Sequence, residues 1–262
     1  MIVLDAATRK YGDKVAVDRL DLTVPPGELF AFLGPNGAGK TTTIKMLVGL
    51  LHPTSGNVRI CGRDMVTQTR EATHFLGYVP DEPFLYDKLS GRELLLFIAQ
   101  MRGLTSRETA DRIERETEHF ALADFLDALI ETYSHGMKQR LAFASALLHD
   151  PAVLVVDEPM LGLDPKSVRL VKDLMRGLAN AGTSIFLSTH TLSVVEEIAD
   201  RIGIVNHGRL NFLGTQRELQ RAFSLHREPL EHLFLKLTDG DDGKAPPSDP
   251  AGTGSPDQVH GE

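Results

Sequence analysis

The glycine-rich stretch GPNGAGKT, residues 34–41, limits the possible folds of this chain more than any other part of its sequence. An apolar strand pattern over residues 29–33 precedes it, and a helical pattern over residues 41–51 follows it. A strand, a glycine-rich turn and a helix in this order let backbone N–H groups converge on phosphate oxygens. Lys40 then reaches the β- and γ-phosphates, and Thr41 reaches Mg²⁺. The stretch therefore predicts a nucleotide-binding loop.

A second group of residues with phosphate chemistry lies in VLVVDEP, residues 153–159. Asp157 ends an apolar strand and can hold Mg²⁺ through water, and Glu158 follows it as a candidate general base. An isolated Asp-Glu pair is more commonly an ordinary solvated strand end. The glycine-rich loop upstream favours the interpretation as a phosphate-transfer site.

The rest of the pattern predicts an α/β fold. Alternating apolar residues within residues 1–33 predict a small antiparallel layer that leads into a buried strand. Capping boxes at Ser90 and Thr105 open the helices of an insertion that covers about residues 88–150. Two later apolar strands with a helix between them predict a buried parallel sheet. The expected later elements are strands 153–156 and 185–188, a helix started by Asp164 and Pro165, the hairpin 201–205 with 209–213, and a helix capped by Thr215 and Glu218.

The stretch YSHGMKQR, residues 133–140, opens a helix that is predicted over residues 134–149, with Ser134 as its N-cap. Placed just ahead of the acidic strand end, it resembles the signature motif of ATP-binding cassette (ABC) ATPases. The resemblance covers about residues 2–237, with the motifs in the family's order. It implies one domain over residues 1–238: a P-loop NTPase core with a parallel sheet, an N-terminal antiparallel β subdomain and an inserted helical subdomain.

The resemblance also implies a mechanism in which two copies of the chain sandwich two ATP molecules with Mg²⁺. Glu158, His190 and Lys40 are then the catalytic residues, with His190 contacting the γ-phosphate. Ser134 and Gly136 bind the γ-phosphate of the nucleotide that the opposite subunit holds. The expected Mg²⁺ ligands are Thr41, Asp81 and Asp157. The expected nucleotide-binding residues are Tyr11, Val17, Gly34, Pro35, Asn36, Gly37, Ala38, Gly39, Lys40, Thr41, Thr42, Asp81, Ser134, Gly136, Asp157 and Asp164.

Two of these residues have a structural alternative. Tyr11 resembles the aromatic residue that stacks on adenine, with Val17 packed beside it, but a strand tyrosine can also simply cover the core. Asp164, in LGLDP, resembles a residue of the loop that crosses the dimer seam. A plain helix cap is the alternative for Asp164, and both roles can hold at once.

Three residues depart from the family's usual motifs. Asp81 stands where the family has a glutamine that links the nucleotide to the membrane subunit. His135 and Met137 replace the first glycine and the glutamine of the usual LSGGQ signature. We expect His135 to be a spacer or surface group rather than a catalytic residue.

Composition restricts the partners of the chain. The net charge is −8, and the acidic Pro/Gly-rich stretch 239–262 carries −5 of it and is expected to be disordered. The rest of the chain has a net charge of −3 and therefore no broad basic surface, so a nucleic-acid partner is not expected. No leader sequence or membrane span is expected, and the single cysteine, Cys61, excludes an internal disulfide.

The expected function is that of the ATPase subunit of a membrane transporter, at the cytoplasmic face of the membrane, with separate transmembrane permease subunits. Residues 230–238, LEHLFLKLT, and GYVPDEPFLYDKLSGRE resemble segments of two-component (ABC-2 type) drug and antibiotic exporters, which favours export. The alternative is a soluble ABC ATPase that acts on ribosomes or DNA. Such relatives usually carry two cassettes or a long coiled coil, whereas this chain has one cassette and no sustained heptads.

Overall fold

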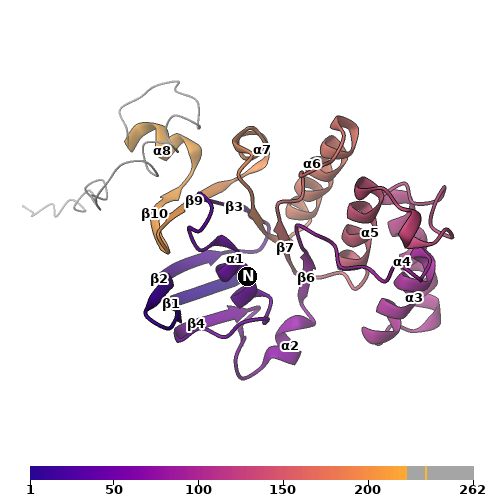
Figure 1. The fold of residues 1–262 in the computed structure, drawn as a ribbon, viewed down its shortest axis with the longest axis horizontal. Coiled ribbons are helices and arrows are strands. Elements are labelled where there is room, and N and C mark those ends of the chain that lie inside the picture. Colours follow the sequence, from indigo (N-terminus) through magenta and orange to yellow (C-terminus); the bar gives the residue numbers. More distant parts are fainter. Residues whose placement is uncertain (223–233, 235–262) are drawn as a thin grey trace, which may run out of the picture.

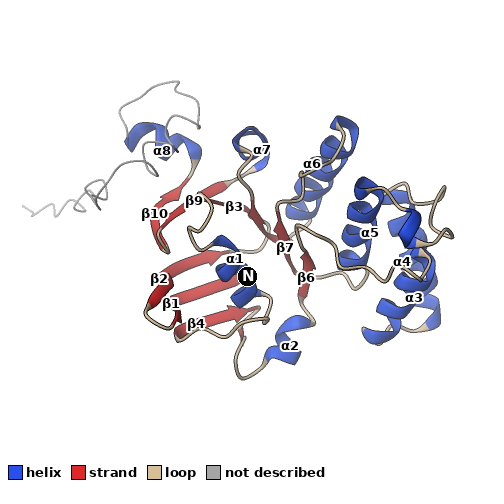
Figure 2. Cartoon of the chain, viewed as in Figure 1, coloured by secondary structure: helices blue, strands red, loops and turns tan. Residues whose placement is uncertain are grey.

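Two β-sheets and a group of helices make up the part of the chain that the structure describes, which is residues 1–222 and Phe234 of a computed structural model (Figure 1). The expected tail at residues 239–262 and, apart from Phe234, the segment 230–238 lie outside the described residues. In Figure 2 the helices α3 to α6 are grouped on the right of the view, beyond β6 and β7, whereas α1 and α2 lie among the strands of the two sheets.

The first sheet is antiparallel and contains the start of the chain, as the alternating pattern predicts. Its strand order is β2-β1-β4-β5. Apolar side chains alternate along β1 and β2, so one face of this sheet packs on the core and the other faces solvent. The strands are β1 (Ile2–Tyr11), β2 (Lys14–Val24), β4 (Ser55–Ile60) and β5 (Arg63–Asp64).

The second sheet has six strands in the order β10-β9-β3-β8-β7-β6. The ladders from β9 to β6 are parallel, and β10 pairs with β9 as the expected antiparallel hairpin. Three of its strands, β3, β7 and β8, are buried along their whole length, which is typical of a parallel sheet covered on both faces. The strands are β3 (Leu29–Leu33), β6 (Leu76–Val79), β7 (Val153–Asp157), β8 (Ser184–Ser188), β9 (Arg201–Asn206) and β10 (Arg209–Gly214).

Helix α1 (Lys40–Leu47) follows β3 and packs in the core between the two sheets. Its buried side chains join a cluster that includes Ile2 from the first sheet and Phe30 and Val155 from the second. The helix ends four residues earlier than expected, because Gly49 adopts a φ of +77° and stops it.

The expected insertion over residues 88–150 is helical and contains α3 (Gly91–Met101), α4 (Ser106–His119), the short 3₁₀ turn η1 (Ile130–Thr132) and α5 (His135–Leu147). Both predicted capping boxes are confirmed: the side chains of Ser90 and Thr105 accept from the third helical N–H, and Glu93 and Glu108 bond back. Helix α6 (Pro165–Asn180) starts after Asp164, as expected.

Three further helices complete the described chain. They are α2 (Thr69–Thr73), α7 (Leu192–Ile198) and α8 (Gln216–Ala222). The predicted capping residues Thr215 and Glu218 of α8 bond to each other's backbone N–H groups. The mixed α/β class expected from the sequence is therefore confirmed.

Candidate active site

The carboxyl ends of β3, β7 and β8 lie next to one another at one edge of the parallel sheet, where ligands bind in such folds. The sheet register pairs Phe32 with Ser188 and Ser188 with Asp157. The glycine-rich loop follows β3, the acidic pair ends β7, and His190 follows β8. The parallel topology thus brings the glycine-rich loop next to two groups that follow it by more than a hundred residues in the sequence.

The loop between β3 and α1 depends on its glycines. Gly37 and Gly39 have φ values of +82° and +109°, which other residues rarely adopt. A Cβ atom at Gly39 would also lie 2.6 Å from the carbonyl oxygen of Ala16. The backbone can therefore approach β2 closely only because this position has no side chain.

Lys40 lies over its own loop. Its ammonium group donates to the carbonyl oxygens of Gly34 at 2.6 Å and Pro35 at 3.2 Å. Burial lowers the pKa of the Lys40 ammonium, while the negative charges of Glu158 and Asp157 act in the opposite direction. The lysine is thus close enough to the acidic pair for their charges to interact.

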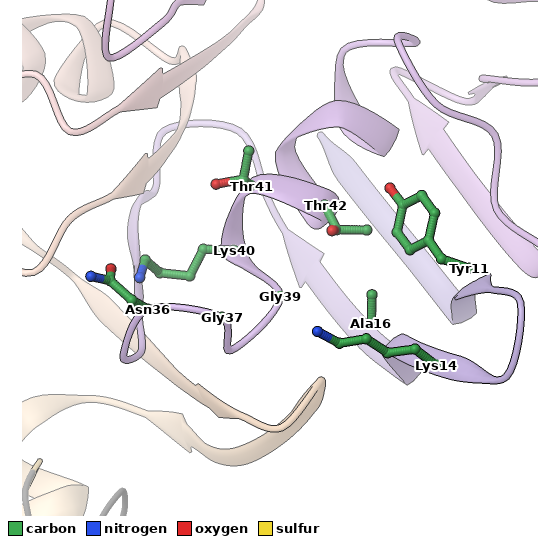
Figure 3. A pocket seen from close by; sticks show the side chains of 9 residues that line it. All are labelled: Tyr11, Lys14, Ala16, Asn36, Gly37, Gly39, Lys40, Thr41 and Thr42. Atoms are coloured by element: carbon green, nitrogen blue, oxygen red, sulfur yellow. The ribbon is translucent and has the colours of Figure 1, made fainter.

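A pocket of about 390 Å³ opens between this loop and the first sheet (Figure 3). It holds six of the predicted nucleotide-binding loop residues and Tyr11 on the opposite wall. Three other loop residues, Gly34, Pro35 and Ala38, are not part of its lining. The lining residues are Tyr11, Lys14, Ala16, Asn36, Gly37, Gly39, Lys40, Thr41 and Thr42.

Tyr11 has the exposure that a stacking platform needs, with 47% of its surface accessible. The guanidinium carbon of Arg9 lies over the ring, 4.9 Å from its centroid. Val17, which we expected beside Tyr11, is 1% exposed and belongs to the core instead, because its side chain packs into the cluster between the sheets. Ala16 takes its place on the pocket wall.

The sequence analysis missed Lys14, which also lines this pocket. Lys14 pairs with Tyr11 across the β1–β2 hairpin, and its ammonium points toward the glycine-rich loop in Figure 3. The signal that could have found it is the two-residue turn Gly12-Asp13, which sets this register.

Asp157 is buried at the end of β7, with 6% of its surface exposed. Burial raises the pKa of its carboxyl group to about 6; the Ser188 hydroxyl lowers it, and the charges of Asp81 and Glu158 raise it further. Asp81 follows β6, the strand beside β7, and its carboxylate accepts a hydrogen bond from the N–H of Glu82 at 2.8 Å. Asp81 is thus near enough to Asp157 for their charges to interact, and its role as a Mg²⁺ ligand stays a prediction.

Glu158 and His190 contact each other directly. One carboxylate oxygen of Glu158 lies 2.9 Å from Nδ1 of His190, and the other accepts from the His190 backbone N–H at 3.3 Å. Glu158 has a φ of +44°, a conformation that costs a residue with a side chain about 1–3 kcal/mol. The backbone bond from Glu158 N–H to the Ser188 carbonyl, 2.9 Å, helps to hold it there.

Ser134, Gly136 and Asp164 are placed apart from the pocket. Ser134 caps α5, where its hydroxyl accepts from the N–H of Met137 at 3.3 Å. Asp164 caps α6 by accepting from the N–H groups of Lys166 and Ser167. Neither α5 nor α6 lines the pocket beside α1, and Figure 1 shows both helices on the far side of β7 from it. The cap role of Asp164 is confirmed, and its role at a dimer seam stays a prediction.

The buried Asp157 carboxylate leads to a prediction for the ligand-free protein. Its folded-state pKa of about 6 exceeds the ordinary value of 3.8, so its ionised form opposes folding. This cost is absent below pH 4, grows as the pH rises, and is complete above about pH 6. Asp157→Asn should therefore raise the free energy of unfolding by about 1–2 kcal/mol at pH 8.

Urea unfolding of ligand-free protein at pH 8 and near pH 4 measures this effect. The gain in the free energy of unfolding should shrink toward pH 4. The control Asp124→Asn replaces an exposed aspartate and should leave the free energy of unfolding at pH 8 close to that of wild type. Equal free energies of unfolding for Asp157→Asn and wild type at pH 8 would contradict the prediction that the buried Asp157 carboxylate opposes folding.

Comparisons of the sequence and of the fold with known proteins identify the same family. The family described as "ABC transporter" matches residues 17–161. The chain is 40% identical to the Nod factor export ATP-binding protein I of Burkholderia pseudomallei over 82% of its own length and 70% of the relative's. It is 40% identical to the bacitracin transport ATP-binding protein BcrA of Bacillus licheniformis, over 78% of this chain and 66% of that one.

A solved structure described as the ATP binding subunit of an ABC transporter has the same fold. It superimposes with a TM-score of 0.86 at 31% identity, and the match covers 90% of this chain and 99% of the other. The glycine-rich loop, the acidic strand end and the histidine after β8 thus lie on a fold that this chain shares with an ATP-binding subunit of an ABC transporter. The chain belongs to the ABC transporter family, as one of its ATP-binding, ATP-hydrolysing subunits.

Proposed function

We propose that the chain works as a homodimer that drives export through separate transmembrane permease subunits, at the cytoplasmic face of the cell membrane. Residues 1–238 would form the cassette, with the helical subdomain at about 88–150. The main observation behind the proposal is that four side chains with phosphate chemistry lie together at one edge of the parallel sheet: Lys40, Asp157, Glu158 and His190. Ser134 lies apart from them, at the start of α5. Relatives that are named for Nod factor export and for bacitracin transport support export as the direction of transport.

ATP binds in the pocket beside α1. Its base stacks on Tyr11, and its phosphates lie in the glycine-rich loop at the start of the helix, where backbone N–H groups and the helix dipole favour negative charge. The Lys40 ammonium exchanges its two loop carbonyls for the β- and γ-phosphate oxygens. Lys14 faces the phosphates from the opposite wall.

The donor set beside the loop fits Mg²⁺. Over residues 1–222 and Phe234, no cluster of three or more His, Cys, Asp or Glu side chains could hold a metal by itself. The Thr41 hydroxyl and the Asp157 carboxylate suffice for Mg²⁺, which takes one or two protein ligands and completes its shell with phosphate oxygens and water. Asp81 supplies a further oxygen nearby. Bound Mg²⁺ neutralises charge on the transferring phosphoryl group.

Glu158 accepts the proton of the attacking water. The contact with His190 orients the Glu158 carboxylate, and the His190 side chain, 64% exposed, remains accessible to the γ-phosphate. The strained φ of Glu158 is consistent with a residue held in place for catalysis.

The site is completed by a second copy of the chain. Ser134 and Gly136 lie at the N-terminus of α5, where a hydroxyl and backbone N–H groups can bind an anion, but they do not line the pocket of their own chain. In a homodimer with two-fold symmetry, each α5 N-terminus faces the γ-phosphate held by the partner. Asp164, at the start of α6, would lie at the same seam.

The membrane partner would dock on the face around α3. Among the described helices none is long and apolar enough to cross a membrane. A groove of about 400 Å³ beside α3 is lined by Leu50, Tyr78, Ile98 and Met101, and Leu50 and Met101 are 68% and 72% exposed. Phe84, 98% exposed, lies in the loop that follows Asp81. Apolar side chains left this open are typical of an interaction surface.

Asp81→Ala tests the link between this surface and the active site. We expect it to lower permease-stimulated ATPase on the order of tenfold, the effect of losing one interaction worth about 1.4 kcal/mol, and basal ATPase much less. The measurement compares ATP turnover with and without the co-purified permease, and Asp87→Ala, also exposed, is the control. Equal losses in both assays would show that Asp81 serves the nucleotide only, and failure to co-purify a permease from membranes would contradict the proposed function itself.

A further inference from the structure

The first turn of α5 is bonded to the loop that follows Glu158, through a residue that the family's signature motif does not usually have. Nε2 of His135 lies 2.9 Å from the carbonyl oxygen of Leu161. A carbonyl oxygen only accepts, so Nε2 carries the hydrogen and donates it. The glycine that the usual motif has at this position could not make the bond.

The same two segments also pack together. A Cβ atom added at Gly162 would lie 3.0 Å from Cδ2 of His135, so the imidazole ring covers the glycine backbone. A Cβ atom added at Gly136 would lie 3.7 Å from a methyl carbon of Leu163. Gly162 has a φ of +70°, which makes it hard to replace by a residue with a side chain. The start of α5 and residues 161–163 are therefore in direct contact through one hydrogen bond and close packing.

This loop is attached at its other end to the candidate general base. The N–H of Leu161 donates to the carbonyl oxygen of Glu158 at 3.3 Å, and Asp164, the N-cap of α6, follows three residues later. Leu161 is thus bonded through its N–H to Glu158 and through its C=O to His135. Leu161 therefore links the first turn of α5 to the backbone of Glu158 by two hydrogen bonds in series.

We infer that His135 is a positioning residue that couples the two composite sites of the dimer to each other. The inference rests on the proposed function, in which Glu158 of a chain acts on the ATP of that chain while Ser134 and Gly136 of the same chain bind the ATP of the partner. His135 and Leu161 join these two half-sites by two hydrogen bonds. Binding of a γ-phosphate at the α5 N-terminus therefore adjusts the Glu158 carboxylate that serves the other nucleotide.

Two substitutions separate the hydrogen bond from the packing. His135→Gln keeps an N–H donor at nearly the reach of Nε2, and His135→Leu keeps a side chain of similar bulk without a donor. His52→Leu is the control, an exposed histidine next to the first sheet. The first readout is the Hill coefficient of ATPase activity against ATP concentration, which two coupled sites raise toward about 2. The second is amide hydrogen exchange at residues 161–163 in nucleotide-free protein.

We expect a Hill coefficient above 1 for wild type, His135→Gln and His52→Leu, and a fall to about 1 in His135→Leu, with faster exchange at residues 161–163 in that variant alone. The inference is overturned by a wild-type Hill coefficient of about 1, by a His135→Leu variant that keeps the wild-type value, or by an equal fall in His135→Gln. These results differ from failure of the proposed function, which would appear as wild-type protein that neither hydrolyses ATP nor dimerises with it.

Discussion

Glu158→Gln should retain ATP binding while ATP hydrolysis falls by about 10²-fold or more. Glutamine preserves the size of the side chain and an oxygen that can accept from the His190 backbone N–H, a bond of 3.3 Å in the structure. It cannot take a proton from water. Because the nucleotide stays intact in both composite sites, the variant should also accumulate an ATP-bound dimer.

Turnover at saturating ATP and size-exclusion chromatography with and without ATP measure the two effects. Glu82→Gln, an exposed glutamate beside Asp81, is the matched control and should hydrolyse ATP at close to the wild-type rate. If Glu158→Gln turned over ATP at a near-normal rate, another group would have to be the general base.

Mixing two inactive variants should restore activity if the sites are composite. Lys40→Ala removes the phosphate contact of a chain's own pocket, and Ser134→Arg blocks the α5 N-terminus that serves the partner's pocket. In a mixed dimer one site carries both changes and the other carries neither. Random pairing of equal amounts makes half of the dimers mixed, so about a quarter of the wild-type sites are intact.

ATPase activity is measured for each variant alone and for the mixture after exchange of subunits. Each variant alone should be nearly inactive, and the mixture should approach about a quarter of wild-type activity if one intact site turns over by itself. A mixture of Lys40→Ala with Glu158→Gln is the control, because both changes affect the pocket of their own chain and no mixed dimer has an intact site. Full ATPase activity of Ser134→Arg as a proven monomer would contradict the composite site.

Local signals predicted the parts of the fold whose bonds form between neighbouring residues. The capping boxes at Ser90 and Thr105 and the cap at Asp164 satisfy N–H groups within three residues, so side-chain identity alone determines them. The loop glycines belong to the same class, since glycine adopts φ values such as +82° and +109° without the strain that a side chain would cause. Strands β4 and β6 and helices α2 and α7 were not predicted, because short elements carry weak periodicity and depend on their partners.

The placement of side chains on surfaces was the less predictable part of the site. Val17 and Ala16 are adjacent in an alternating strand, and the register of β2 on β1 decides which of them faces the core. The same register puts Lys14 opposite Tyr11. The bond of His135 to Leu161 joins residues 26 positions apart, and nothing near either residue in the sequence indicates it.

The sequence by itself determined which chemical groups are available. It showed which residues can bind phosphate, which carboxylates stand at the end of a strand, and which hydroxyl caps α5. Those properties follow from residue types at fixed spacings along one element. Only the tertiary structure decided which groups meet, because β3, β7 and β8 become neighbours through parallel pairing of distant segments. That pairing brings the charges of Asp157 and Glu158 within reach of Lys40, and burial in the covered sheet raises the pKa of Asp157.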